Sequence, residues 1–379
     1  MLGPAAAGRL DIADIVRAHR PALEASCRLT RSQKRVLTDI AQCRTAALGG
    51  HLDRCLACGY EHPSYNSCRN RHCPKCQALA QERWIEARRA RMLGVRHFHV
   101  VFTLPAELRP LAAFAPVVVF EALFQAAQRT LLEFGKRRLG ATLGATLVLH
   151  TWTRTLHFHP HVHAIVTGGG LALDGTRWCP SARRFLFPVG ALGRVFRAKM
   201  MAALRRAYRR AAFLGFEDFR DPRAFDRLMQ AIARLSWNVY AKAPFNKGQH
   251  VLDYLGRYTH RVGIANSRLL AVSDHTVTFR TKGTAAETIS PVAFLRRFVQ
   301  HVLPDGFHKI RHLGLYASAK RAQLARQRLP APTPSAPLLP WRERFRLLTG
   351  RDLPTCPQCG APLIAVPLPS ARAPPAVAP

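Results

Sequence analysis

Two closely spaced pairs of cysteines impose the strongest constraint on how this chain can fold. Cys55 and Cys58 form one pair and Cys73 and Cys76 the other, within residues 51–77, a segment with little apolar periodicity. Such a segment cannot build a hydrophobic core of its own. Two thiolates two residues apart can hold one ion from a tight turn, and a second pair completes the tetrahedron of a structural zinc site. The spacing therefore predicts that these four cysteines bind a structural Zn²⁺ ion.

Other side chains near these pairs leave the exact ligand set open. The donors that lie close enough in the sequence to replace a cysteine are His51, His62, Cys68 and His72. Cys43 is expected instead to be a thiol of the protein core. A third Cys-x-x-Cys pair, Cys356 and Cys359, supplies half of a tetrahedron. It can dimerise, borrow ligands or bind nothing.

The net charge of the chain points to a polyanionic partner. Lysine and arginine number 57 against 22 aspartates and glutamates, which leaves a formal charge of +35. A compact protein with this much like charge repels itself, so a partner of opposite sign is expected, either nucleic acid or an anionic membrane surface. Arg69, Arg71 and Lys75 surround the second cysteine pair. They are therefore candidates for contacts with DNA phosphates.

Composition excludes wholesale disorder and gives little sign of a membrane protein. Hydrophobic residues make up 48% of the chain, which is more than a disordered chain contains. The longest apolar run, residues 111–120, includes Pro116 and is far shorter than the ~20 residues of a spanning helix. Asp11 and Asp14 interrupt the N-terminal segment before a secretory signal can form. We therefore expect a cytoplasmic protein with reduced thiols, in which cysteines bind metal.

The hydrophobic pattern predicts an α+β fold in three consecutive domains. A small helical and zinc-binding domain is expected over residues 1–93, a large catalytic domain over 94–325, and a proline-rich tail with a Cys-x-x-Cys turn over 326–379. Strands mixed irregularly with helices favour a mainly antiparallel sheet flanked by helices. The strands expected are residues 97–105, 145–154 and 161–169, with a hairpin over 267–282. The main helices expected are residues 111–139, 196–212, 249–262 and 291–303.

A run of histidines leads into one of these strands. The run TLHFHPHVHAIV contains His157, His159, His161 and His163. Strand alternation places His161 and His163 on one face, about 6–7 Å apart, where two imidazoles can chelate one ion. His150 on the adjoining strand is the preferred third ligand, with His250 and His159 as alternatives. A histidine-rich turn that contacts phosphates is the competing interpretation.

Two tyrosines share one face of the expected helix 249–262. Tyr254 and Tyr258 are four residues apart, so their side chains are neighbours on the helix surface. Core aromatics of an amphipathic helix are the competing interpretation. The basic side chains that flank the pair, and that are expected to contact DNA, are Lys247, Arg257 and Arg261. Such cations lower the pKa of a phenol from its ordinary value of about 10 and so favour its attack on a phosphate.

Together these motifs resemble the two-tyrosine rolling-circle transposases of the insertion-sequence-ninety-one type, which belong to the His-hydrophobic-His endonuclease superfamily. The segments that carry the resemblance are HPHVH (159–163), YLGRYTHRV (254–262) and the cysteine-rich YNSCRNRHCPKCQ (65–77). HFHVVFTLP (97–105), LGGH (48–51) and KIRHLG (309–314) are similar as well. The motifs follow the family order between about residue 25 and residue 320.

The resemblance implies a mechanism. His161, His163 and a third ligand hold Mg²⁺ or Mn²⁺, which polarises the scissile phosphate of single-stranded DNA. Tyr254 or Tyr258 attacks that phosphate, giving a 5′-phosphotyrosyl link and a free 3′-hydroxyl, and the other tyrosine serves a second cleavage. The zinc-binding segment helps to recognise the ends of the mobile element. A protein of this kind is expected at the bacterial nucleoid.

Two other functions fit parts of the same pattern. A replication-initiation or relaxase-type nicking enzyme uses the same metal and tyrosine chemistry without integrating the strand. A zinc-containing DNA-binding protein without catalysis requires the histidine and tyrosine pairs to be incidental. A covalent adduct with single-stranded DNA distinguishes either enzyme from such a binding protein.

Overall fold

The chain divides into two compact units whose segments interleave along the sequence. The computed structural model describes residues 10–89, 92–242, 263–318 and 355–368, together with a few single positions between 319 and 354. The first unit draws on residues 1–81, 260–302 and 334–379, and the second on residues 82–259 and 303–333. This division differs from the three consecutive domains expected from the sequence, because later segments of the chain return to the first unit.

The second unit is built on an antiparallel sheet with the strand order β11-β4-β5-β3-β7, and β6 pairs with β5 outside that path. Its strands are β3 (His97–Thr103), β4 (Ala141–Trp152), β5 (Phe158–Ala172), β6 (Trp178–Pro180), β7 (Val239–Ala241) and β11 (Ile310–Gly314). All of its strand pairs are antiparallel. The predicted α+β class, with a mainly antiparallel sheet flanked by helices, is confirmed.

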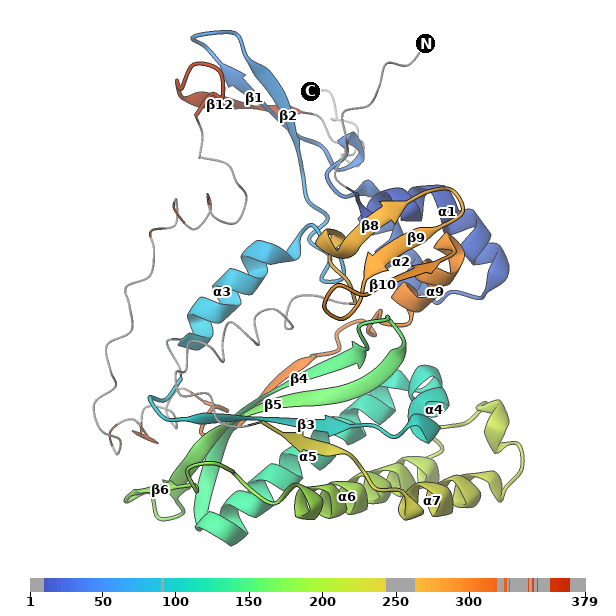
Figure 1. The fold of residues 1–379 in the computed structure, drawn as a ribbon, viewed down its shortest axis with the longest axis vertical. Coiled ribbons are helices and arrows are strands. Elements are labelled where there is room, and N and C mark those ends of the chain that lie inside the picture. The colour runs from blue at the N-terminus through green and yellow to red at the C-terminus, as the bar shows by residue number, and fades with distance from the viewer. Residues whose placement is uncertain are drawn as a thin grey trace, which may run out of the picture. The chain divides into compact units, whose positions relative to one another are not determined.

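One face of this sheet is apolar and packs on helices (Figure 1). The helices are α4 (Arg109–Phe114), α5 (Pro116–Leu139), α6 (Val189–Arg209) and α7 (Ala224–Arg234). Phe98, Phe102 and Val162 belong to the core that the sheet shares with them. Because successive side chains on a strand point to opposite faces, the residues between these positions must lie on the other face.

The described residues of the first unit include three helices and a small sheet. The helices are α1 (Ile12–Ser26), α2 (Arg31–Gln42) and α9 (Pro291–Val299), and the sheet comprises β8 (Leu269–Val272), β9 (Val277–Arg280) and β10 (Ala286–Ile289). Asp11 caps α1 by accepting a hydrogen bond from the backbone of Ala13. The same carboxylate accepts a bond from Asn266 at 2.9 Å and pairs with Lys75 at 2.6 Å. One side chain therefore joins three distant segments of this unit.

A second three-stranded sheet in the first unit contains strands that the sequence did not predict. It has the order β12-β1-β2, from β1 (Gly50–Cys55), β2 (Glu61–Tyr65) and β12 (Leu363–Leu368). β12 lies within the proline-rich tail expected over residues 326–379. Helix α3 (Gln77–Arg89) follows the cysteine-rich segment. Among the described residues, no helix is long and apolar enough to cross a membrane.

Gly314 ends β11 in a conformation that only glycine tolerates at that place. Its φ is 58°, close to the 59° of Gly140, which ends α5. A Cβ at Gly314 would overlap the backbone carbonyl of Leu143, whereas a Cβ at Gly140 would meet no atom within 4 Å. The two glycines share backbone strain and differ in crowding.

We expect Gly314→Ala to lower the free energy of unfolding more than Gly140→Ala. Positive φ alone costs an L residue about 1–2 kcal/mol, and displacement of the β4 backbone adds about 1–3 kcal/mol at Gly314. Denaturant unfolding of both variants measures the difference. Equal losses would show that the β4 carbonyl does not confine this turn.

Candidate functional site

Three histidines on neighbouring strands of the large sheet converge. His150 on β4 is directly opposite His161 on β5, and His163 lies two residues further along β5. Each of the three offers a ring nitrogen, and these atoms all lie within 4.8 Å of one another. Their ring centroids are 4.3–5.5 Å apart. The structure therefore brings together the three residues predicted from the sequence as ligands of a divalent ion, which we call the histidine cluster.

Hydrogen bonds orient two of these rings. Nδ1 of His161 lies 2.6 Å from the backbone carbonyl oxygen of His159. A carbonyl only accepts, so Nδ1 carries the proton and Nε2 keeps a lone pair for a cation. Nδ1 of His163 lies 2.7 Å from Nε2 of His99 on β3. Outer contacts of this kind fix the tautomer and orientation of metal-ligating histidines.

Burial favours the neutral form of the two histidines on β5. Burial lowers the pKa of His161 to about 4, although the hydrogen bond to the His159 backbone carbonyl raises it in part. Burial likewise lowers the pKa of His163 well below its ordinary value, and the nearby His161 and His99 lower it further. Neutral imidazole is the form that binds metal. The donor set, the tautomer of His161 and the protonation state all fit a cation.

The remaining candidates for the third ligand do not join the cluster. Nδ1 of His159 accepts a hydrogen bond from Arg109 at 2.9 Å, and His159 is absent from the group of converging donors. His250 lies outside the described residues. His150 is thus the donor that the geometry favours.

Other polar and apolar groups share the histidine face of the sheet. His97 contacts the Tyr316 hydroxyl at 2.7 Å, and His312 accepts a hydrogen bond from Arg88 at 2.8 Å. Val148 and Ile165 form a small apolar cluster with partly buried Trp84, Met92 and Ile310. The histidine cluster therefore occupies one end of a face that is otherwise partly covered within this unit.

The predicted tyrosine pair lies in a part of the chain that the structure does not describe. Tyr254 and Tyr258, with the basic residues Lys247, Arg257 and Arg261, all fall within residues 243–262. Convergence of the tyrosines with the histidine cluster on one phosphate thus stays a prediction.

The structure distributes the predicted zinc ligands over two clusters instead of one. Cys73 and Cys76 converge with Cys43 and Cys68, whereas Cys55 and Cys58 converge with Cys356 and Cys359. We call these the helix cluster and the hairpin cluster. The single set Cys55, Cys58, Cys73 and Cys76 is therefore corrected. Its two pairs lie at different places in the first unit, because Cys55 and Cys58 are carried away on the turn between β1 and β2.

The helix cluster is compact and largely buried. Sγ of Cys43 lies 3.2 Å from Sγ of Cys76, and Sγ of Cys68 lies 3.7 Å from the same atom. Cys43 and Cys73 are fully buried. Hydrogen bonds from the Cys68 and Cys73 thiols lower the pKa of Cys43 to about 7. Cys43, expected as a plain core thiol, is a candidate ligand because the end of α2 carries it to the other three.

The other residues named around the cysteines take other roles. His51 contacts Asp53 at 3.1 Å, and His72 lies 3.1 Å from the Asn70 side chain. Neither they nor His62 belong to a converging group among the described residues. Lys75, a predicted DNA contact, pairs with Asp11. Arg69 is exposed and Arg71 half-buried.

His99 is the site residue that the sequence reading missed. Its signal was present, because HFHVVFT alternates histidines with apolar residues and His99 falls between Phe98 and Val100. What the pattern lacks is the strand order. β3 had to be known as the neighbour of β5 before His99 could be placed beside His163.

Comparisons with known proteins agree on one family. The model described as "Putative transposase" matches residues 144–323, and that described as "Transposase zinc-binding domain" matches residues 15–104. The chain is 42% identical over 368 residues to "Putative transposase y4qJ" of Sinorhizobium fredii, covering 92% of each chain. It is 30% identical to "Transposase for insertion sequence element IS801" of Pseudomonas savastanoi pv. phaseolicola, covering 86% of this chain and 82% of that relative. No solved structure gives a significant match.

Replacing His99 should weaken metal binding at the histidine cluster without removing a ligand. We expect His99→Ala to reduce Mn²⁺ affinity by about 10–100-fold, the usual effect of losing an outer contact to a ligating histidine. Mn²⁺ titration followed by electron paramagnetic resonance measures it. His97→Ala is the matched control on the same strand and face, since His97 contacts Tyr316 instead. Equal losses in both variants would contradict a specific role for His99.

Proposed function

The chain belongs to the insertion-sequence-ninety-one-type transposases that carry an N-terminal zinc-binding domain, and on this basis we propose that it cleaves and rejoins single-stranded DNA in rolling-circle transposition. DNA is the partner that a transposase requires, and the formal charge of +35 suits it. The observation that carries the proposal is the histidine cluster, in which three ring nitrogens meet within 4.8 Å.

His150, His161 and His163 would hold the divalent ion. When bound, such an ion supplies Lewis-acid polarisation of a phosphate oxygen. Imidazole suits softer cations than Mg²⁺, so Mn²⁺ should bind this set better than Mg²⁺. Three protein ligands leave positions open for substrate oxygens, as catalytic metal sites generally do.

Tyr254 and Tyr258 are the proposed nucleophiles. The tyrosine oxygen bonds to phosphorus and the bond from phosphorus to the 3′ oxygen breaks. The phenolic proton ends on the released 3′-hydroxyl, and the 5′ phosphate stays on the tyrosine. The covalent link conserves the phosphodiester as a transferable bond. A second tyrosine allows a second cleavage, so that strand transfer needs no external energy source.

A structural zinc ion belongs to the same proposal. Cys43, Cys68, Cys73 and Cys76 form a complete tetrathiolate set, and all four lie within the stretch matched by the zinc-binding family model, residues 15–104. A closed set of four thiolates is typical of a structural zinc site. We propose that zinc in the helix cluster stabilises this domain, and that the domain helps to recognise the ends of the element.

Among the alternatives, transposition is favoured over replication initiation and plasmid nicking because both curated relatives are named as transposases. A binding protein without catalysis would not need three histidines, one buried and two half-buried, around one point.

We expect His161→Ala or His163→Ala to reduce cleavage of single-stranded element ends by at least about 100-fold, since Lewis-acid stabilisation is worth several kcal/mol. DNA affinity should change little. Cleavage of labelled DNA with Mn²⁺, beside a gel-shift assay, measures both. His159→Ala, outside the cluster, serves as the control and should keep its activity. Wild-type cleavage by either cluster variant would refute the metal assignment.

The double variant Tyr254→Phe/Tyr258→Phe should form no covalent protein–DNA adduct, because both proposed nucleophilic oxygens are gone. Denaturing electrophoresis after incubation with single-stranded element ends detects the adduct, and mass spectrometry locates the modified residue. Tyr240→Phe is the matched control, since Tyr240 is an exposed tyrosine on the edge strand β7. An adduct that persists in the double variant would identify another nucleophile.

A further inference from the structure

Two Cys-x-x-Cys turns from opposite ends of the sequence meet in the first unit. Sγ of Cys55 lies 3.5 Å from Sγ of Cys359, and Sγ of Cys58 lies 3.5 Å from Sγ of Cys356. All four sulfurs lie within 4.8 Å of one another. Neither family model covers Cys356 or Cys359, because the two matches end at residues 104 and 323.

The two turns have the same backbone conformation. In the first, the Gly59 amide donates to the Cys55 carbonyl at 3.0 Å, and the Cys55 amide donates to the Tyr60 carbonyl at 2.8 Å. In the second, Gly360 donates to Cys356 at 2.9 Å. The Cys356 amide donates to the Ala361 carbonyl at 2.8 Å. Each turn therefore presents two thiols from the same hydrogen-bonded frame.

A glycine makes each turn possible. Gly59 has a φ of 73° and Gly360 a φ of 76°, a region that residues with a side chain rarely adopt. A Cβ on either glycine would meet no atom within 4 Å. Both positions thus require glycine because of the positive φ and not because of crowding. This is expected if the turn conformation, which presents the two thiols, is what the sequence maintains.

A strand pairing holds the second turn in place. β12 begins at Leu363, just after the turn, and runs antiparallel to β1 from the pair Cys55–Leu363 to the pair Gly50–Leu368. β1 also pairs with β2 on its other side. The central strand thus ends at Cys55, at the point where the four thiols meet.

From this geometry we infer that Cys55, Cys58, Cys356 and Cys359 bind a second structural zinc ion, which fastens the C-terminal segment to the N-terminal hairpin. The site is separate from the helix cluster and from the histidine cluster. It goes beyond the proposed catalytic function and does not depend on the tyrosine chemistry.

The sulfur spacing fits a metal better than a disulfide. Four thiolates around zinc, each at about 2.3 Å, lie ~3.8 Å from one another, close to the 3.5 Å observed. A disulfide requires about 2.05 Å. Cys55 and Cys356 are buried, with 1% and 3% of their surface exposed.

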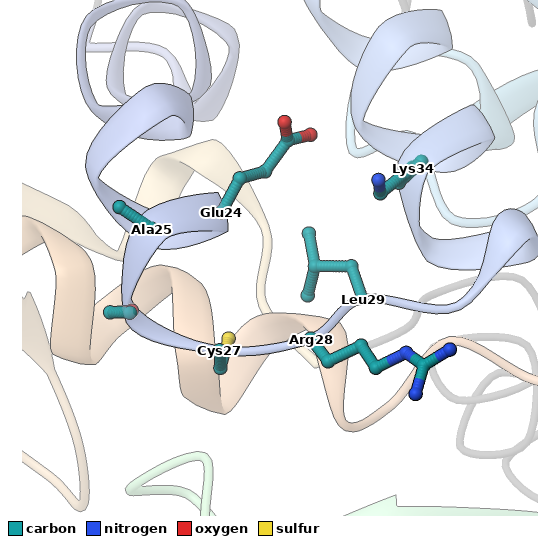
Figure 2. A pocket seen from close by; sticks show the side chains of 7 residues that line it. Glu24, Ala25, Cys27, Arg28, Leu29 and Lys34 are labelled. Atoms are coloured by element: carbon teal, nitrogen blue, oxygen red, sulfur yellow. The ribbon is translucent and has the colours of Figure 1, made fainter.

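A matched pair of cysteines provides the control. Cys27 and Cys179 belong to neither cluster among the described residues. Figure 2 shows Cys27 among the residues that line a pocket, together with Glu24 and Lys34. Its sulfur donates to the Leu23 carbonyl at 3.5 Å. Cys179 lies on β6 in the second unit.

The test is the zinc content of the full-length chain, measured by plasma mass spectrometry in a His161→Ala background, which removes zinc from the histidine cluster. We expect two zinc ions per chain, one in Cys356→Ser/Cys359→Ser, and two in the control Cys27→Ser/Cys179→Ser. Cys359→His should keep two, because histidine can replace one thiolate in a structural site. X-ray absorption of the protein with its cysteines intact should show four sulfurs around each zinc.

Some results would overturn the inference. One zinc ion per chain that is retained in Cys356→Ser/Cys359→Ser would show that the hairpin cluster binds none. Two ions retained in Cys356→Ser/Cys359→Ser would show that the C-terminal pair is not a ligand, and iron in place of zinc would refute the choice of metal. None of these results bears on DNA cleavage, so failure here is distinguishable from failure of the proposed function.

Discussion

The candidate active site depends on the strict alternation of side chains along three antiparallel strands. On β3, Phe98 and Val100 enter the core beneath the sheet, so His99 between them must lie on the opposite face. On β5, Val162 and Ala164 do the same for His163. The pairing of β4 with β5 then sets His150 against His161. Burial of the apolar face on α5 and α6 thus presents the histidines together.

Burial has a second consequence for these histidines. Rings withdrawn from water stay neutral at neutral pH, and neutral rings are metal ligands. The same arrangement therefore places the donors, fixes the tautomer of His161 through a backbone carbonyl and keeps the donors unprotonated. Protonated, positively charged rings would repel both the cation and one another. The proposed catalytic ion would bind ring nitrogens that the fold has already brought together.

In the first unit, we expect metal-binding thiols to supply part of the stabilisation that burial of apolar side chains supplies in the second unit. The segment around the cysteines has little apolar periodicity, and its strands β1 and β2 are half-buried or exposed along most of their length. Each cluster joins parts of the chain that are remote in sequence: the end of α2 with the segment before α3, and the hairpin with the C-terminal turn. Metal coordination gives a large stabilisation from a few residues, which suits a region that buries little apolar surface.

The local features follow from the amino-acid sequence alone, because they depend on neighbouring residues. Period-two alternation identified the strands around His99 and His163 and placed His161 and His163 on one face. Residue spacing identified the cysteine turns as candidate metal ligands, and charge pointed to a polyanionic partner. Which thiols converge follows from the tertiary structure. Cys58 meets Cys356 across 298 positions of sequence, and Cys43 meets Cys76 across 33. Coordination depends on distance in space. That distance is set by the order of the strands in the sheets and by the return of the C-terminal segment to the first unit. Local residue spacing encodes neither.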